Sequence, residues 1–164
     1  MKRLIVVIVI AVFACLLVGC ATPNRLVYSS GFSFANYDYV VIAKTEGRDT
    51  ATSLYGMDVE FANLISRYNM KVIGDKEYEK FPLNVQKRTL NARMSVTASN
   101  NRILLAVSFD DAITGRTGAS ITALTRGNIF NLDDRTKAFE TASETIVKAL
   151  QQDKGLQITD EKSK

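Results

Sequence analysis

An alternation of apolar and polar residues between Leu90 and Phe109 limits the folds open to this chain more than any other feature. Apolar residues fall at every second position on both sides of the polar turn Ser99-Asn100-Asn101. Successive side chains of a strand point to opposite faces, so this period predicts two antiparallel strands with one apolar face. The residues of that face are Leu90, Ala92, Met94, Val96, Ile103, Leu105, Val107 and Phe109.

A second turn and a third strand extend this meander. The turn Asp110–Gly115 places carboxylates beside backbone amides and ends on a glycine suited to positive φ. The next strand is predicted from about Arg116 to Leu124. Asp133-Asp134 is then expected to cap a final helix. The apolar face of that helix is Ala138, Phe139, Ala142, Ile146, Ala149 and Leu150.

A strand, a helix and a second strand are predicted ahead of the meander. The run Tyr39–Ala43 is rich in β-branched residues, as expected of a strand buried on both faces. Thr52 or Ser53 is expected to cap the helix, Asn69 to end it, and residues 70–74 to form the next strand. A unit of this length predicts parallel strands with a right-handed crossover. The helix face is Leu54, Met57, Phe61, Leu64, Ile65 and Tyr68.

These elements predict an α/β (α+β) fold, in which a βαβ unit precedes a three-stranded antiparallel meander and a C-terminal helix, and a mixed sheet packs against helices. The domain is expected to span residues 38–153, with a tether over 20–37 and a disordered tail over 154–164. Aromatic residues near the domain start either pack against the edge of the sheet or form a partner-facing strip. They are Tyr28, Phe32, Phe34, Tyr37 and Tyr39.

Three stretches carry a resemblance to a known fold. They are the strand Val40-Val41-Ile42, the helix Met57–Tyr68 leading to Lys71-Val72-Ile73, and Val107–Gly115 with its Asp-x-x-Thr-Gly turn. In this order they resemble the α/β domain shared by curli-secretion-channel-type lipoproteins and the amino-terminal domain of the Tol system's propeller protein. The resemblance covers most of residues 38–151 and implies the fold, whereas function does not transfer at this level.

The amino-terminal sequence has the layout of an export signal. Met1-Lys2-Arg3 supplies positive charge, and the apolar run Leu4–Val18 is shorter than the roughly 20 residues that span a bilayer. The tetrad Leu17-Val18-Gly19-Cys20 resembles the lipobox of bacterial prolipoproteins. That resemblance implies removal of residues 1–19 and a diacylglyceryl cysteine at Cys20, with acyl chains such as palmitate. An uncleaved membrane helix and a signal peptide cut without lipidation are the alternatives.

The cysteine count favours this lipid anchor. Cys15 would leave with the signal peptide, so the mature chain would keep Cys20 alone and could form no intramolecular disulfide. Two or three acyl chains hold a protein on a membrane far more firmly than one chain does. By resemblance to Gram-negative sorting, Ala21 in place of aspartate favours the outer membrane, facing the periplasm, over the inner membrane or the cell surface.

Composition narrows the function further. The 145 residues after the signal are enough for one core, and losing Lys2 and Arg3 reduces the formal net charge from +4 to about +2. That charge gives no reason to expect nucleic-acid binding. The chain has no histidine, which removes the commonest general base and metal ligand. No serine-nucleophile motif or phosphate loop is present, so no catalytic residue is predicted.

Two groups of charged residues remain as candidates. Asp110-Asp111 and Asp133-Asp134 are carboxylate pairs that a calcium ion could use if the fold brought them together. Local backbone bonding at a turn and a helix cap explains them equally well, and we predict no metal and no cofactor. The basic residues form either a solvated face or a patch for anionic lipid or an acidic partner. They are Lys87, Arg88, Arg93, Arg102, Arg116 and Arg126.

The sequence therefore predicts a non-enzymatic, lipid-anchored module that binds protein partners or copies of itself in an envelope or secretion assembly. The alternative is a periplasmic carrier that holds a lipid or other hydrophobic molecule between the sheet and the helices.

Overall fold

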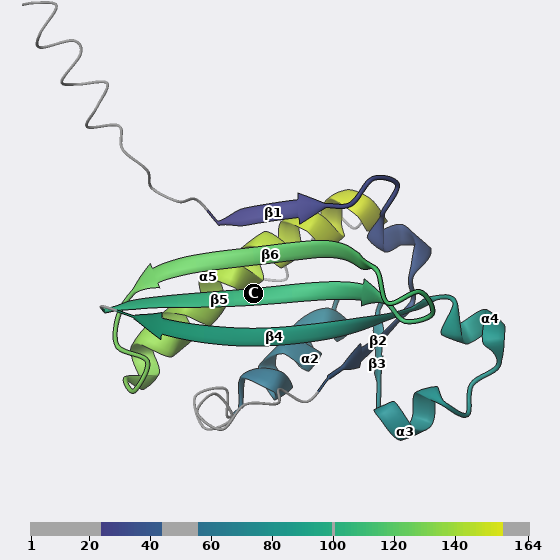
Figure 1. The fold of residues 1–164 in the computed structure, drawn as a ribbon, viewed down its shortest axis with the longest axis horizontal. Coiled ribbons are helices and arrows are strands. Elements are labelled where there is room, and N and C mark those ends of the chain that lie inside the picture. The colour runs from purple at the N-terminus through teal and green to yellow at the C-terminus, as the bar shows by residue number, and fades with distance from the viewer. Residues whose placement is uncertain (1–23, 44–55, 100, 156–164) are drawn as a thin grey trace, which may run out of the picture.

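The computed structural model describes residues 24–43, 56–99 and 101–155 (Figure 1). Its strands are β1 (Arg25–Tyr28), β2 (Tyr39–Ile42), β3 (Lys71–Ile73), β4 (Thr89–Ser99), β5 (Arg102–Asp111) and β6 (Thr117–Arg126). Its helices are α2 (Met57–Ser66), α3 (Asp75–Tyr78), α4 (Leu83–Gln86) and α5 (Leu132–Lys154), with one 3-10 turn, η1 (Phe34–Asn36).

The described strands form one mixed sheet in the order β1-β6-β5-β4-β2-β3. Strand β2 runs parallel to both β3 and β4, while β4, β5, β6 and β1 pair antiparallel. The predicted βαβ unit, the meander and the C-terminal helix are all present, so the predicted fold class is confirmed.

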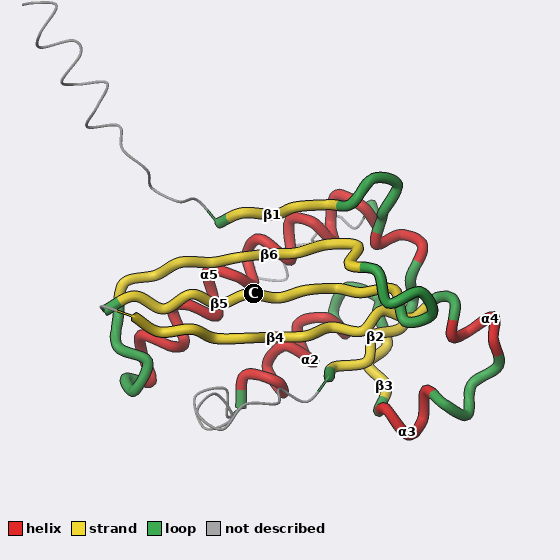
Figure 2. Tube along the Cα trace, in the orientation of Figure 1, coloured by secondary structure: helices red, strands yellow, loops and turns green. Residues whose placement is uncertain are grey.

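The core lies between one face of this sheet and the helices α5 and α2 (Figure 2). Every predicted inner-face residue of β4 and β5 is buried, and all six predicted contact residues of α5 are buried too. Three of those six are alanines, Ala138, Ala142 and Ala149, whose small side chains let the helix lie close to the strands. The alternating apolar residues of the strands and the apolar face of α5 thus pack against each other in a single layer.

The cap of α5 differs from the prediction. Asn131 is the N-cap, and its side chain accepts a hydrogen bond from the Asp133 N–H at 2.9 Å. Asp133 and Asp134 lie in the first turn, where negative charge is favourable. The Asp134 carboxylate accepts the Asn128 N–H at 2.7 Å instead, which fixes the loop before the helix.

Helix α2 begins at Met57, with Gly56 as its N-cap in a left-handed conformation. Leu54 and the predicted caps Thr52 and Ser53 lie outside the described residues. Helix α2 ends at Ser66, three residues before the predicted end at Asn69, and Tyr68 of the predicted helix face lies in the turn that follows. Asn69 takes a left-handed φ of 57° in that turn, two positions before β3.

The predicted tether over 20–37 extends too far into the fold. Strand β1 within it pairs with β6, and Phe34 of η1 is fully buried against the core. The end of α5 holds η1 in place, because Asp153 accepts the Phe34 N–H at 2.8 Å and the Lys154 ammonium donates to the Tyr37 carbonyl at 2.7 Å. The folded domain therefore includes β1 and η1, which lie before residue 38.

The aromatic residues of this entry segment pack against the fold, as one of the two alternatives predicted. The ring of Phe32 lies 5.0 Å from Phe34 and 5.5 Å from Tyr37, and Phe34 lies 5.0 Å from Phe109 in the core. Phe32 also covers Gly118 of β6 so closely that no side chain fits there. These aromatic rings cover the end of the sheet at which β5 is followed by β6.

The sheet has a second face that helices α2 and α5 do not cover. Near β2, residues of the α3–α4 segment lie on that face, where the Phe81 ring is 6.1 Å from the Tyr39 ring. Over β4, β5, β6 and β1, none of the described helices covers this face, which is called here the open face (Figure 1). Among the described helices, none combines the length and apolar character required to cross a bilayer.

Replacing Phe34 by alanine should lower the free energy of unfolding by about 3–5 kcal/mol, because it empties a fully buried site. Phe130→Ala is the matched control, since it removes the same side chain where it is 90% exposed and should cost less than about 0.5 kcal/mol. Urea denaturation of both variants measures the difference. Equal losses would contradict the place of η1 in the core.

Candidate interaction surface

The predicted lipidation site lies outside the described residues. Cys20 and the preceding Leu17, Val18 and Gly19 belong to the segment ahead of Asn24, where the described chain begins. Strand β1, which starts at Arg25, is the described element nearest to Cys20 along the chain.

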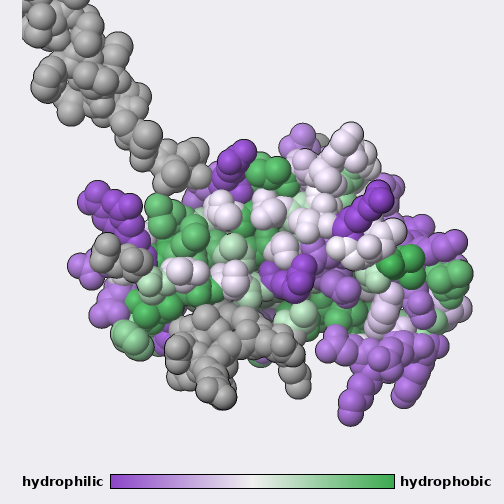
Figure 3. Space-filling view, in the orientation of Figure 1, coloured by the Kyte–Doolittle hydropathy of each residue, from purple (hydrophilic) through white to green (hydrophobic). Residues whose placement is uncertain are grey.

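The middle of the open face carries mostly small polar and apolar side chains, with Arg93 beside them. The side chains on this face come from neighbouring positions in the register of β4, β5 and β6. Figure 3 shows pale residues of intermediate hydropathy over the middle of the face. A shallow hollow of about 260 Å³ lies among them. Its lining is Arg93, Ser95, Ala106, Val107, Ser108 and Ser120.

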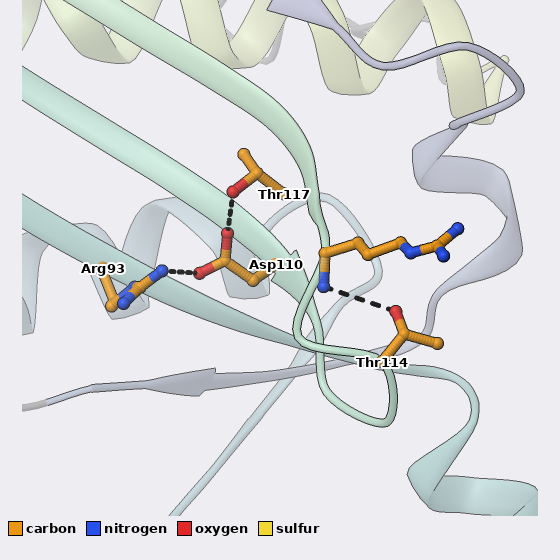
Figure 4. A network of polar contacts seen from close by, with 5 residues as sticks. Arg93, Asp110, Thr114 and Thr117 are labelled. Atoms are coloured by element: carbon orange, nitrogen blue, oxygen red, sulfur yellow. Dashed lines mark hydrogen bonds and ion pairs between the residues drawn. The ribbon is translucent and has the colours of Figure 1, made fainter.

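Asp110 is a buried carboxylate with two partners (Figure 4). Its Oδ2 accepts from the Arg93 guanidinium at 2.5 Å, and its Oδ1 accepts from the Thr117 hydroxyl at 2.6 Å. The Asp110 side chain is 3% exposed and that of Arg93 is 63% exposed. Removing Arg93 would leave a desolvated charge, so the pair holds together and fixes Arg93 on the open face.

Asp111 closes the turn between β5 and β6. Its Oδ1 accepts the N–H of Ile113 at 3.1 Å, the N–H of Thr114 at 2.7 Å and the Thr114 hydroxyl at 2.9 Å. Its Oδ2 accepts the Tyr37 hydroxyl at 3.0 Å, and Gly115 takes a φ of 67°. The Asp-x-x-Thr-Gly motif is therefore a turn-forming device that also ties the entry segment to the meander.

Burial and hydrogen bonding shift the pKa of both partners in the contact between Tyr37 and Asp111. Burial raises the pKa of the Asp111 carboxyl, but the hydrogen bonds from Thr114, Tyr37 and Ile113 together bring the pKa below its ordinary value. Burial, followed by the bond to Asp111, raises the pKa of Tyr37 to about 12. Between acid and strongly alkaline pH, the phenol stays a donor and the carboxylate an acceptor.

The two aspartate pairs do not meet, contrary to what a shared calcium site requires. Asp110 and Asp111 end β5, whereas Asp133 and Asp134 follow β6, which runs back along the whole length of the sheet before α5 begins (Figure 1). The pairs therefore lie at opposite ends of the sheet. Within the described ranges, no group of three or more histidine, cysteine or acidic side chains is arranged to hold a metal ion.

The candidate basic residues are divided among several places. Arg88 pairs with Asp38 at 2.6 Å and Arg93 pairs with Asp110. Arg102 and Arg126 lie directly opposite each other on β5 and β6. They form one end of the sheet, called here the Arg102 end, and Arg116 lies near the other end, called the Asp110 end.

The Arg102 end also carries exposed apolar side chains that the sequence analysis did not single out. Phe130 is 90% exposed and Leu132 is 65% exposed, on either side of the cap Asn131. The sequence contains an indication of this exposure in Asn128–Leu132, because the apolar residues there precede α5 and do not follow the spacing of its apolar face. Loops that display large apolar groups are candidates for binding.

Comparisons with known proteins give structural similarity at low identity. No protein-family model matches the chain, and no curated protein matches its sequence. The chain is similar to the PelC dodecamer from Paraburkholderia phytofirmans, with 16% identity and a TM-score of 0.45 over 78% of this chain and 97% of that one. It is also similar to lipoprotein GNA1162 from Neisseria meningitidis, with 11% identity and a TM-score of 0.42 over 68% and 96%.

A third similar structure is a homolog of a neuraminyllactose-binding hemagglutinin from Helicobacter pylori, with 12% identity and a TM-score of 0.39 over 80% of this chain and 91% of that one. The neighbours thus include a bacterial lipoprotein. Similarities this distant assign no function to the chain.

Asp111→Asn should weaken the fold at neutral pH and change its acid sensitivity. A carboxyl whose folded pKa is lowered stabilises the fold above the unfolded pKa of about 3.9 and loses that effect as pH falls through the folded pKa. The gap in unfolding free energy between wild type and variant should therefore narrow below about pH 4. Urea titrations at several pH values measure it, and a gap that stays constant down to acid pH contradicts the assignment.

Proposed function

We propose that this chain is a lipid-anchored, non-catalytic module of a bacterial envelope. Cys20 holds it at the periplasmic face of the outer membrane, where the domain binds other proteins of an envelope or secretion assembly. The observation that carries the proposal is a lipobox-like tetrad directly ahead of a folded domain.

The distance between the anchor and the fold supports this role. Arg25, the first residue of β1, is five positions after Cys20, and five residues reach at most about 18 Å. A lipid on Cys20 would keep the domain against the membrane surface. Such a short link between anchor and domain suits a protein that functions at the surface of one membrane.

The arrangement of the carboxylates supports a non-catalytic role. Asp110 is committed to an ion pair and Asp111 to a turn, and the chain has no histidine to serve as a base. These acidic groups perform structural tasks.

The packing of the described residues does not favour the carrier alternative. The layer between the sheet and α5 is filled by buried side chains, among them Leu105, Ile121 and Ile146, each at most 1% exposed. A hydrophobic ligand would have to displace this core, so the anchored module is the better-supported function.

Cys20→Ser should abolish lipidation and processing. Cells producing the variant should show a precursor that keeps residues 1–19 and takes up no labelled palmitate. Cys15→Ser is the matched control and should behave as wild type, because Cys15 leaves with the signal. Immunoblots of fractionated cells and palmitate labelling measure both. A Cys20→Ser chain that remains in the membrane at wild-type size contradicts the anchor.

Crosslinking in live cells tests the binding role. An amine-reactive crosslinker should give at least one discrete adduct larger than the monomer for the lipidated chain. The Cys20→Ser precursor should lose that adduct, because it is held in the wrong place. Adducts between two copies would identify self-association as the interaction. A chain that stays monomeric at every crosslinker concentration contradicts the binding role.

A further inference from the structure

We propose that the Arg102 end of the sheet is a membrane-contact tip, which inserts Phe130 and Leu132 among the headgroups of the anionic lipid surface that carries the anchor. This inference rests on the proposed lipid anchor and deepens it by fixing how the domain faces the membrane.

The first observation is that hydrogen bonds fix the loop before α5, in which the Phe130 side chain is exposed. Gly127 donates its N–H to the Asn101 carbonyl at 2.9 Å, and the N–H of Phe130 donates to the Asn128 side chain at 3.0 Å. Ile129, the preceding residue, packs against the core. A loop tied down in this way presents the 90% exposed Phe130 as a fixed feature of the surface.

The second observation is a pair of like charges on the same end. Arg102 and Arg126 are directly opposite in the register of β5 and β6, and next to them Leu104 lies opposite Leu124 on the same face. Like charges directly opposite in an antiparallel pair destabilise a sheet. Among the described residues, no ion pair is recorded for either arginine. An anionic surface would relieve the repulsion between them.

The third observation is the direction of β1. Strand β1 pairs antiparallel with β6 and Arg25 is opposite Thr122, so the amino-terminal end of β1 points toward the end of β6 that carries Arg126 (Figure 1). Cys20 lies within about 18 Å of Arg25 along the chain. The anchor would therefore bring this end, and not the Asp110 end, to the lipid.

The combination of groups fits a lipid surface. Arginines beside phenylalanine and leucine are the composition of segments that sit at the membrane interface, where the cations meet phosphate headgroups and the apolar groups enter the acyl boundary. Figure 3 shows hydrophilic and hydrophobic residues side by side at the left of the molecule, which is the Arg102 end. A second copy or a protein partner is the competing occupant.

The test places a fluorescent probe at each end of the lipidated chain. The mature chain would have no free thiol, so a cysteine at Leu132 or Leu83 can be labelled alone with an environment-sensitive dye. These positions are matched, being leucines that are 65% and 58% exposed, and Leu83 on α4 lies at the opposite end (Figure 1). The labelled proteins are reconstituted into vesicles of phosphatidylethanolamine and phosphatidylglycerol that contain nitroxide-labelled lipid.

We expect quenching and a blue-shifted emission for Leu132→Cys and solvent-like emission for Leu83→Cys. Adding Phe130→Ser to the Leu132→Cys chain should reduce the quenching at least about twofold, since an apolar anchor is lost. Arg102→Gln with Arg126→Gln should reduce it similarly, and only in vesicles that contain phosphatidylglycerol.

The outcomes separate the tip from the anchor. A chain that floats with the vesicles while Leu132→Cys is quenched no more than Leu83→Cys overturns the tip and leaves the anchor standing. A chain that does not float overturns both. Solvent-like emission from the labelled Leu132→Cys chain, together with a disulfide between two copies of the unlabelled Leu132→Cys chain after addition of an oxidant, assigns this end to protein contact and overturns the tip.

Discussion

The packing of α5 across the inner face of the meander is the interaction on which the rest of the structure depends. Alternating apolar residues from β4, β5 and β6 need a cover, and the alanine-rich face of α5 supplies one at close range. Because α5 runs the length of the sheet, it begins at the Arg102 end and finishes at the Asp110 end. There Asp153 and Lys154 hold the entry segment, so the two ends of the domain are joined through one helix.

This arrangement decides what the molecule presents to its surroundings. With α2 and α5 on one face, β4, β5, β6 and β1 keep an open face of small side chains, and the edge of β6 is free to pair with β1. That pairing points the amino-terminal end of β1 toward the Arg102 end, where Phe130 is exposed and two arginines face each other. Topology alone thus brings the predicted anchor, positive charge and exposed apolar groups to one side of the domain.

Much of the fold was predictable because its signals are local. The period of two in β4 and β5 and the period of 3.6 in α5 are visible in neighbouring residues, and both matched the observed burial. The Asp-x-x-Thr-Gly turn is likewise local, since Asp111 bonds residues two and three positions ahead.

The misses have long-range causes. Strand β1 is four residues long and exists through pairing with β6, nearly a hundred positions later, so no neighbouring pattern announces it. Phe34 was expected to pack at the edge of the sheet, and its full burial likewise depends on residues far along the chain, Phe109 and Asp153. Asp110 is fixed by Arg93 across two strands, and the separation of the aspartate pairs follows from the direction of β6. Lipidation is the converse case, because a short motif predicts it whatever the fold.

The central claim is that the mature chain starts with an acylated Cys20 just ahead of β1, and intact-mass and peptide mass spectrometry of the native protein test it most directly. We predict that residues 1–19 are absent and that the amino-terminal peptide carries a diacylglyceryl group on the Cys20 sulfur. An amino-terminal peptide with a free thiol at Cys20, or one that still contains residues 1–19, would contradict it.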